Sequence, residues 1–376
     1  MSQRAAPSHH VGALRTATSE SRSVAFIHTG TLGWGSVSER YKRYQGQLGL
    51  DLVPYAVEGF EPQLGHLWRL GVTPWVIASA VAGRRAYRQA VRDGHRRFLF
   101  VTQSHALMLP RSSRFPVATY GDATWHQIGG MASYQVRYDW GTRLLEKRGM
   151  RDLRLRRALM LCMSTWYKRD LAETYGFRHG SCVHLPLMAD PDYWVPKPRE
   201  SDSRFRVVFV GGDFRRKGGD ILLEASRVLG KDAEFVFVTH SREPIPDGYE
   251  VHTGLKPDSI ELRNVMQSCD LLALPTRGDC NSHVSVEAAL CGLPAVVSSV
   301  GALPEIVIDG QTGTVLDSWD AEQWAATIRG YANDRARLAE FGRRARERAS
   351  EYHGIGTHLT RLQRALVEQW KGFDLC

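Results

Sequence analysis

Residues 275–305 read PTRGDCNSHVSVEAALCGLPAVVSSVGALPE. In this stretch Asp279 comes eight positions before Glu287, and small residues lead on through Pro294 into the β-branched segment 295–298. The order predicts a loop that carries one acid, a helix that starts near the other acid, and then a buried strand. In an open α/β sheet, ligands bind where such loops follow the carboxyl ends of the strands. The two acids are therefore candidates for a binding site.

Short apolar runs alternate with helical patterns on both sides of a break that contains Pro191, Pro196 and Pro198. Continuous apolar strands between helices favour parallel sheets that are covered on both faces. The sequence therefore predicts an α/β protein with two doubly wound, Rossmann-like domains that face each other across a cleft. The expected strands are 24–28, 98–102, 117–120 and 159–163 before the break, and 206–210, 234–239, 249–252, 271–274 and 295–298 after it.

This pattern divides the chain into five parts. Residues 1–21 lack an apolar segment, so we expect a disordered leader and not a signal peptide. Residues 22–190 would form the first domain, 191–204 a linker, and 205–350 the second domain, which contains the two acids. We expect residues 351–376 to form a helix that packs back on the first domain.

The positive charge of the chain is concentrated in its first part. The net charge is +9, but residues 1–200 hold 28 Lys and Arg against 15 Asp and Glu, whereas the rest holds 21 against 25. The densest basic run is 143–157. A solvated helix face is the simpler interpretation, and contact with an anionic membrane surface or an acidic acceptor is the alternative. Nucleic acid is not expected, because the chain has no zinc-finger, helix-turn-helix or RNP motif.

Other features restrict the class of protein. No apolar run approaches the roughly 18–20 residues that span a bilayer. The six cysteines show no CxxC pair or metal-ligand spacing, so we expect free thiols and no metal. A cytoplasmic protein is the expectation, with a peripheral position at the inner face of the membrane as the alternative.

The segment 210–219, VGGDFRRKGG, places Gly211 and Gly212 directly after an expected strand and three cations before the next helix. Glycines let the backbone approach a ligand, and Arg215, Arg216 and Lys217 could neutralise a pyrophosphate. An ordinary turn is the alternative. The pattern is neither a Walker A nor a GxGxxG motif, which counts against ATPase and NAD-binding functions.

Combined with the two acids, this loop describes a more specific ligand. Cations suit a diphosphate, and carboxylates suit the hydroxyls of a ribose and of a second polyol. Helix capping by Glu287 and a turn role for Asp279 are the alternatives. Together the two segments predict a site for a sugar nucleotide.

At these residues the chain resembles the retaining glycosyltransferases of the group 1 family (family 4), which have the GT-B fold. The resemblance extends over residues 24–350 and is most specific over 206–313, where the family's E-x7-E element corresponds to Asp279 and Glu287. It implies that Glu287 binds the ribose and that Asp279, shorter by one methylene, binds the donor sugar. The segment implied to meet the donor sugar and phosphate consists of Asn281, Ser282, His283 and Val284.

The resemblance also assigns the phosphate and base contacts. Lys217 corresponds to the family's phosphate-binding Lys, whereas Gly212 stands where the family has an Arg, so Arg216 or Arg215 would supply the second cation. Gly254 and Leu255 correspond to the segment that holds the base.

In the first half, Gly121 and Asp122 correspond to a His-Asp pair near the reacting sugar, which makes Asp122 the expected catalytic residue of that domain. His126 is an alternative, and a structural role is the commoner one for a lone His. Gly33 and Gly35 would lie against the diphosphate or the acceptor. Ser164 is expected to cap a helix.

The function implied is transfer of a sugar, with retention, from a UDP- or GDP-hexose to a hydroxyl of a glycan, lipid or natural product. Asp122, Lys217, Arg216 and Asp279 would be catalytic, and the nucleotide sugar would be a co-substrate with no further cofactor. An epimerase of the same fold and a non-catalytic sugar-nucleotide-binding protein are the alternatives. Gly121 and Gly212, which depart from the family pattern, keep the second alternative open.

Overall fold

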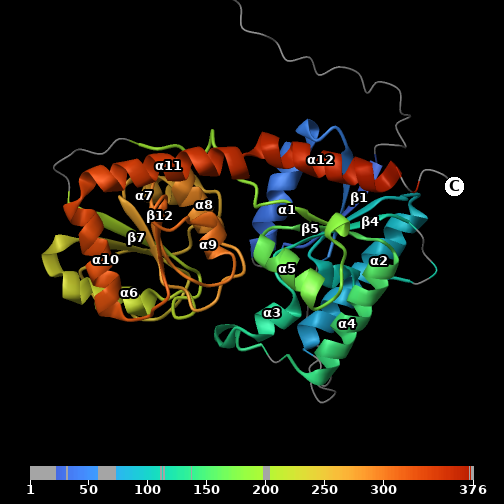
Figure 1. The fold of residues 1–376 in the computed structure, drawn as a ribbon, viewed down its shortest axis with the longest axis horizontal. Helices are drawn as coiled ribbons and strands as arrows, with labels where there is room; N and C mark the ends of the chain where they lie inside the picture. The colour runs from blue at the N-terminus through green and yellow to red at the C-terminus, as the bar shows by residue number, and fades with distance from the viewer. Residues whose placement is uncertain are drawn as a thin grey trace, which may run out of the picture.

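The computed structural model describes residues 23–30, 33–57, 73–110, 112, 115–136, 138–197, 204–371 and 373. It contains two parallel six-stranded sheets, each flanked by helices, that lie side by side (Figure 1). The fold class expected from the sequence is therefore confirmed. The expected leader, residues 1–21, lies outside the described residues, as does part of the expected linker.

The first sheet has the strand order β2-β1-β3-β4-β5-β6. Its central strand β3 is fully buried, with Phe98 and Phe100 in one apolar cluster and Leu99 and Val101 in another. Because side chains alternate along a strand, these two clusters lie on opposite faces of the sheet and are both covered by helices. The elements are β1 Ser23–His28, α1 Gly33–Tyr44, β2 Asp51–Ala56, α2 Pro74–Arg92, β3 Phe98–Val101, β4 Val117–Gly121, α3 Trp125–Gly129, α4 Trp140–Leu155, β5 Leu159–Cys162, α5 Thr165–Glu173 and β6 Cys182–His184.

The second sheet has the order β12-β11-β10-β7-β8-β9. One apolar cluster includes buried residues from β7, β8, β10 and β11 and from the helices around them. The elements are β7 Arg206–Val210, α6 Gly219–Leu229, β8 Glu234–Val238, β9 Glu250–His252, α7 Ile260–Gln267, β10 Leu271–Leu274, α8 His283–Leu290, β11 Ala295–Ser298, α9 Leu303–Ile306, β12 Gly313–Leu316, α10 Ala321–Asn333, α11 Arg335–His353 and α12 Ile355–Lys371.

The sequence did not predict β2, β6 and β12, and all three are edge strands. An edge strand has only one neighbour and is partly exposed, so it needs no continuous apolar run. In β2, Pro54 interrupts the apolar pattern, which is tolerated at a sheet edge. The absence of the usual signal therefore follows from the position of these strands.

Three consecutive helices, α10, α11 and α12, form the last part of the described chain. Asp334 ends α10 and caps α11, where its side chain accepts a hydrogen bond from the Arg337 amide. After Gly354 the chain continues as α12, whose apolar side packs on the first sheet, while α11 lies along the second (Figure 1). The α12 residues that are buried in the apolar cluster with Leu99 and Val101 of β3 are Ile355, Leu359, Leu362, Leu366 and Trp370. The last helix thus joins the two halves of the molecule.

Candidate functional site

The loop between β10 and α8 carries Asp279, and α8 carries Glu287. The helix begins at His283, because the hydroxyl of Ser282 accepts a hydrogen bond from the Ser285 amide at 3.2 Å. The expectation that Glu287 lies at the helix start was therefore wrong: Glu287 lies in the second turn. A serine hydroxyl at the N-cap satisfies an amide of the first turn, so the helix needs no cap from Glu287, which is buried.

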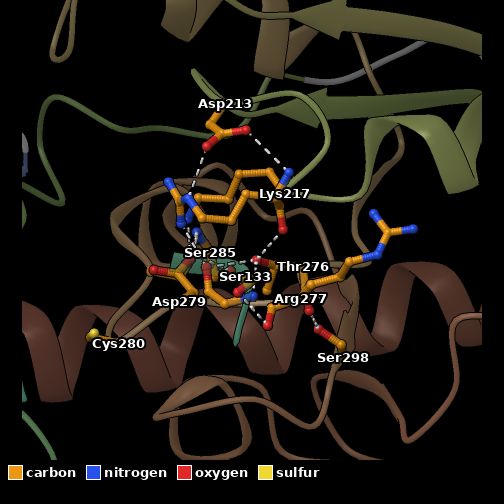
Figure 2. Close-up of polar contacts among 12 residues, drawn as sticks. Ser133, Asp213, Lys217, Thr276, Arg277, Asp279, Cys280, Ser285 and Ser298 are labelled. Carbon is orange, nitrogen blue, oxygen red and sulfur yellow. Dashed lines mark hydrogen bonds and ion pairs between the residues drawn. The ribbon is translucent and has the colours of Figure 1, made fainter. Parts of the chain in front are cut away.

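A compact set of polar contacts joins this loop to the loop after β7 (Figure 2). The Lys217 ammonium donates to Asp279 Oδ2 in a short ion pair, and both side chains are largely buried. Arg216 Nη1 donates to the Gly278 carbonyl at 2.6 Å. Lys217 and Asp279 are 62 residues apart in the sequence, and the parallel pairing of β7 with β10 brings them together.

Two glycines permit this close approach. Gly218 has φ of +82°, and a Cβ there would lie 2.0 Å from the Pro275 carbonyl oxygen. Gly301 has φ of +57°, and its Cβ would lie 2.0 Å from the carbonyl oxygen of Asp279. Gly211 also needs to be small, because a Cβ would lie 2.7 Å from the Lys217 side chain. A side chain at Gly218 would push apart the two loops that hold Lys217 and Asp279, and one at Gly301 would push the Asp279 loop away from the loop after β11.

Glu287 has a partner that the sequence did not indicate. Arg40, from α1 of the first half, is buried and donates from Nη2 to Glu287 Oε1 at 2.5 Å. The same guanidinium donates to both carboxylate oxygens of Asp258, at 2.6 and 3.0 Å, and from Nη1 to the Met188 carbonyl. Burial alone would lower the pKa of Arg40, but the two carboxylates raise it above its ordinary value. Burial raises the pKa of Glu287, and Arg40 opposes that rise.

The start of α8 lies against the start of α1. A Cβ on Gly33 would be 3.6 Å from the ring of His283, so this glycine faces the first residue of α8. His283 lies 3.4 Å from Arg40, and burial together with Arg40 lowers its pKa to about 3. The ring is therefore neutral at pH 7. Gly35 needs to be small for a local reason, since a Cβ would lie 2.8 Å from the Gly30 carbonyl oxygen.

Asp122 follows β4 and lies near the Asp279 loop. Burial raises its pKa to about 7, and the charge of Asp279 adds to the rise. At Gly121, where the family resemblance predicts a His, a Cβ would be 2.6 Å from Gln103 Oε1 and 2.7 Å from the Tyr167 hydroxyl. Those two side chains occupy the space that a larger residue would need, which explains this departure from the family pattern.

Several expected residues lie apart from these contacts. The Arg215 side chain is 72% exposed and pairs with Glu243 at 2.9 Å, so Arg216 is the cation of the pair that reaches the site. Gly212 is exposed, and the nearest atom to a Cβ there is on His240 at 3.5 Å, so no contact requires a glycine. Gly254 is exposed with φ of +77°. Leu255 lies in the loop that leads to Asp258 and packs against the apolar cluster of the second sheet.

The positions of the other expected residues are simpler. Ser282 and Val284 flank the first residue of α8, and Asn281 has a buried Oδ1 without a hydrogen-bond partner among the described residues. His126 Nδ1 lies 2.8 Å from Asp170 Oδ1, with half of its side chain exposed. Ser164 caps α5 as expected, with its hydroxyl accepting from the Tyr167 amide at 3.0 Å.

Further contacts cross between the halves of the molecule, and apart from Arg216 the sequence assigned no role to their residues. The Ser133 hydroxyl donates to the Arg277 carbonyl at 2.8 Å, and the Arg216 guanidinium lies over the Tyr134 ring at 4.8 Å. The Glu305 carboxylate accepts from the first two amides of α5, each at 2.7 Å. With the Arg40 contacts, they hold the two halves together on several sides of the site.

A cavity of about 220 Å³ lies beside these contacts. Its lining comes from both halves of the chain and includes Ser164, His184, Asn281, Glu305 and Arg348. Within the described parts of the chain, no cluster of three or more His, Cys, Asp or Glu is arranged to hold a metal ion. None of the described helices is long and apolar enough to cross a membrane.

The architecture is that of the GT-B class. Sucrose-phosphate synthase from Thermosynechococcus elongatus superimposes with a TM-score of 0.73, at 14% identity, over 93% of this chain and 100% of that one. An Anabaena protein, HepE, solved in complex with UDP and glucose, superimposes with a TM-score of 0.63, at 17% identity, over 92% of this chain and 100% of that one. At these identities the likeness establishes the fold.

A match to a known protein family lies in the second half of the sequence. Residues 204–334 match the family described as glycosyl transferases group 1. D-inositol 3-phosphate glycosyltransferases of Mycobacterium marinum and Segniliparus rotundus are 40% and 32% identical, over 161 and 155 residues. These matches cover 39% and 36% of this chain, and the chain spans about a third of the length of each relative. The likeness to the group 1 glycosyltransferases is thus shown for residues 204–334.

Proposed function

We propose that this protein is a retaining glycosyltransferase that moves a hexosyl group from a nucleoside diphosphate hexose to a hydroxyl acceptor. The observation that carries the proposal is the convergence of Lys217, Arg216 and Asp279 beside the start of α8, with Glu287 one turn further on. Cations, helix amides and two carboxylates within one region match the parts of such a donor.

The chemistry would be mainly electrostatic. As the bond to the anomeric carbon breaks, negative charge grows on the leaving diphosphate. Lys217, Arg216 and the first amides of α8 would stabilise that charge, because fixed cations and amides in a water-poor site act strongly on developing charge. Lys217 now pairs with Asp279, so a diphosphate that binds there would share or take over its ammonium group.

Binding of the ribose would involve an exchange at Glu287. Arg40 donates to Oε1 of this acid, so a ribose hydroxyl must use the other oxygen or displace the guanidinium. Asp258 can retain Arg40 during this exchange through its two hydrogen bonds. Movement of the two halves of the molecule would instead separate Arg40 from both Glu287 and Asp258, which belong to the second half. Closure over the donor would exclude water from the activated sugar.

Asp122 is the residue of the first half that we assign to the reacting sugar. It lies close enough to Asp279 for the two charges to interact. With its pKa near 7, Asp122 can accept or donate a hydrogen bond to a sugar hydroxyl in the neutral range. We assign the acceptor to this side of the site.

The comparisons suggest the first substrates to test. UDP-glucose is the first donor, because HepE, which has the same fold, holds UDP and glucose. An inositol phosphate is the first acceptor, because relatives that match 36% and 39% of this chain are named for D-inositol 3-phosphate.

The test incubates the protein with UDP-, GDP- and dTDP-hexoses, with and without candidate acceptors, and measures release of nucleoside diphosphate. Release that depends on an acceptor, together with a glycosylated product of retained configuration, is the expected result. Interconversion of the donor without a glycosylated product would indicate an epimerase. Donor binding without any turnover on a broad acceptor library would indicate a binding protein.

A further inference from the structure

The outer face of α4, in the first half of the molecule, has an unusual composition. Every residue of this helix that the structure leaves exposed is either cationic or large and apolar. The three apolar ones are among the seven large apolar side chains that the described residues expose. These outer-face residues are Trp140, Arg143, Leu144, Lys147, Arg148, Arg151, Arg154 and Leu155.

The spacing places the apolar side chains together. Trp140, Leu144 and Leu155 are separated by 4 and 11 residues, which puts them on one face of a helix. Their side chains are 68%, 61% and 68% exposed. Arg151 lies in the same row, and the other four cations flank it. The outer face therefore carries a row of apolar side chains that Arg151 interrupts and that positive charge borders.

The acids of α4 do not neutralise this face. Glu146 is buried beneath the helix, where it accepts hydrogen bonds from the Trp125 amide and the Tyr138 hydroxyl. Asp152 is half-buried. Across the described parts of the chain, no ion pair joins the five cations of the outer face to a carboxylate. Arg143 donates to the Tyr138 carbonyl at 2.9 Å, and Arg154 donates to the Gly176 carbonyl at 3.4 Å. The exposed side chains of Lys147, Arg148 and Arg151 direct their charge to solvent.

The position of α4 leaves this face accessible. The helix lies on the first half of the molecule, beyond α3 as seen from the second half (Figure 1). Its inner side, which includes Gly149, Met150 and Leu153, packs into the fold. Among the residues that the structure describes, none of the contacts that join the two halves involves its outer face. A partner could therefore bind there without obstructing the site.

We propose that the outer face of α4 is a docking surface for an anionic lipid bilayer. Tryptophan is favoured at the headgroup level of a membrane, leucine reaches the acyl boundary, and Lys and Arg extend their charged ends to lipid phosphates. A nucleic acid would satisfy the cations but offers no apolar environment for Leu144 and Leu155. The combination of both residue types favours the bilayer, and it would bring the acceptor-side half of the protein to the membrane.

The test measures binding of the full-length protein, without nucleotide, to vesicles by flotation. Vesicles of phosphatidylcholine with 30 mol% phosphatidylglycerol are compared with pure phosphatidylcholine. We expect binding to the anionic vesicles only, and weaker binding at high salt because the charges are exposed. A cation near an anionic surface contributes about a fivefold factor, so Arg148→Glu with Arg151→Glu should weaken binding by ~25-fold or more.

Matched controls separate the helix from overall charge and hydrophobicity. Arg227→Glu with Lys231→Glu makes the same charge change on exposed residues of the other half, and it should leave vesicle binding within about twofold of wild type. Trp140→Ser with Leu144→Ser should weaken binding by about tenfold or more, whereas Val228→Ser with Ile260→Ser should not. The single variant Arg151→Gln should weaken binding by about fivefold.

Three results would overturn the proposal: no vesicle binding by the wild type, equal binding to neutral vesicles, or α4 variants that bind like their controls. Binding to heparin or DNA but not to vesicles would indicate a polyanion surface instead, and would also overturn it. Because no donor or acceptor enters this measurement, its outcome is independent of the proposed transferase activity.

Discussion

The two acids of the candidate site, Asp279 and Glu287, are held in different ways. Asp279 pairs with Lys217, which belongs to the same half of the molecule and is fixed by the pairing of β7 with β10. Glu287 pairs with Arg40, which comes from the other half. Movement of the two halves would break the Glu287 contact and leave the Asp279 contact intact. The comparison implies that the sugar and phosphate side of the site is preformed, whereas the ribose side depends on the arrangement of the domains.

The largest expected effect comes from Arg40→Met, which removes the partner from across the molecule. It leaves the buried Glu287 and the partly buried Asp258 without their cation, and breaking a buried pair in this way typically costs about 3–5 kcal/mol. We expect a lower thermal midpoint and looser packing of the two halves, seen as a larger radius of gyration by X-ray scattering. Arg40→Lys should be intermediate. A variant with wild-type stability and dimensions would show that the contact does not hold the domains.

The second-largest effect concerns the contact between Lys217 and Asp279, which lies within the second half of the molecule. Lys217→Ala should lower kcat by about 10²–10³-fold, because removal of one group that stabilises developing charge costs about 2.7–4 kcal/mol. Donor affinity, measured by calorimetry, should change much less. Arg215→Ala is the matched control, since its side chain points to Glu243, and its turnover should remain near wild type. Equal losses in both variants would contradict the special role of Lys217.

Glu287→Gln tests the ribose assignment and keeps the size of the side chain. We expect donor affinity to fall by about 10–100-fold, because a hydrogen bond to a charged group contributes about 1.5–3 kcal/mol. The loss should be similar for nucleoside diphosphate without a sugar. Asp279→Asn should instead weaken binding of the whole donor more than that of the nucleoside diphosphate. Unchanged affinity in Glu287→Gln would remove this acid from the site.

The smallest effect concerns Asp122 and pH. The folded protein holds the pKa of Asp122 at about 7, above its ordinary value. The native state therefore binds more protons than the unfolded chain between about pH 4 and pH 7, and stability falls as pH rises through that window. Asp122→Asn carries no charge, so it should match the wild type at low pH.

By pH 8 we expect Asp122→Asn to be more stable than the wild type by about 1–2 kcal/mol. Thermal midpoints measured from pH 4 to pH 8 provide the test, with Asp232→Asn, an exposed acid of the second half, as the control. A constant difference between the variant and the wild type across this range would contradict the raised pKa.

The chemical identity of the candidate site could largely be read from local sequence. The glycines and cations of 211–217 and the spacing of Asp279 and Glu287 required only short-range patterns. Those patterns did not predict which of two adjacent arginines reaches the site. Arg215 and Arg216 are equivalent in sequence, and the direction of their side chains depends on whether Glu243 or the Gly278 carbonyl is near.

The sequence by itself determined the class of fold, because buried parallel strands need continuous apolar runs between helices, and this pattern is local. It also determined the residue types of the candidate donor site. Only the tertiary structure placed Arg40 on Glu287 and Asp258, residues 247 and 218 positions away along the chain. Nothing in the helix around Arg40 distinguishes it from Arg43. Its partners are selected by how the two halves pack, and that depends on contacts spread over the whole chain.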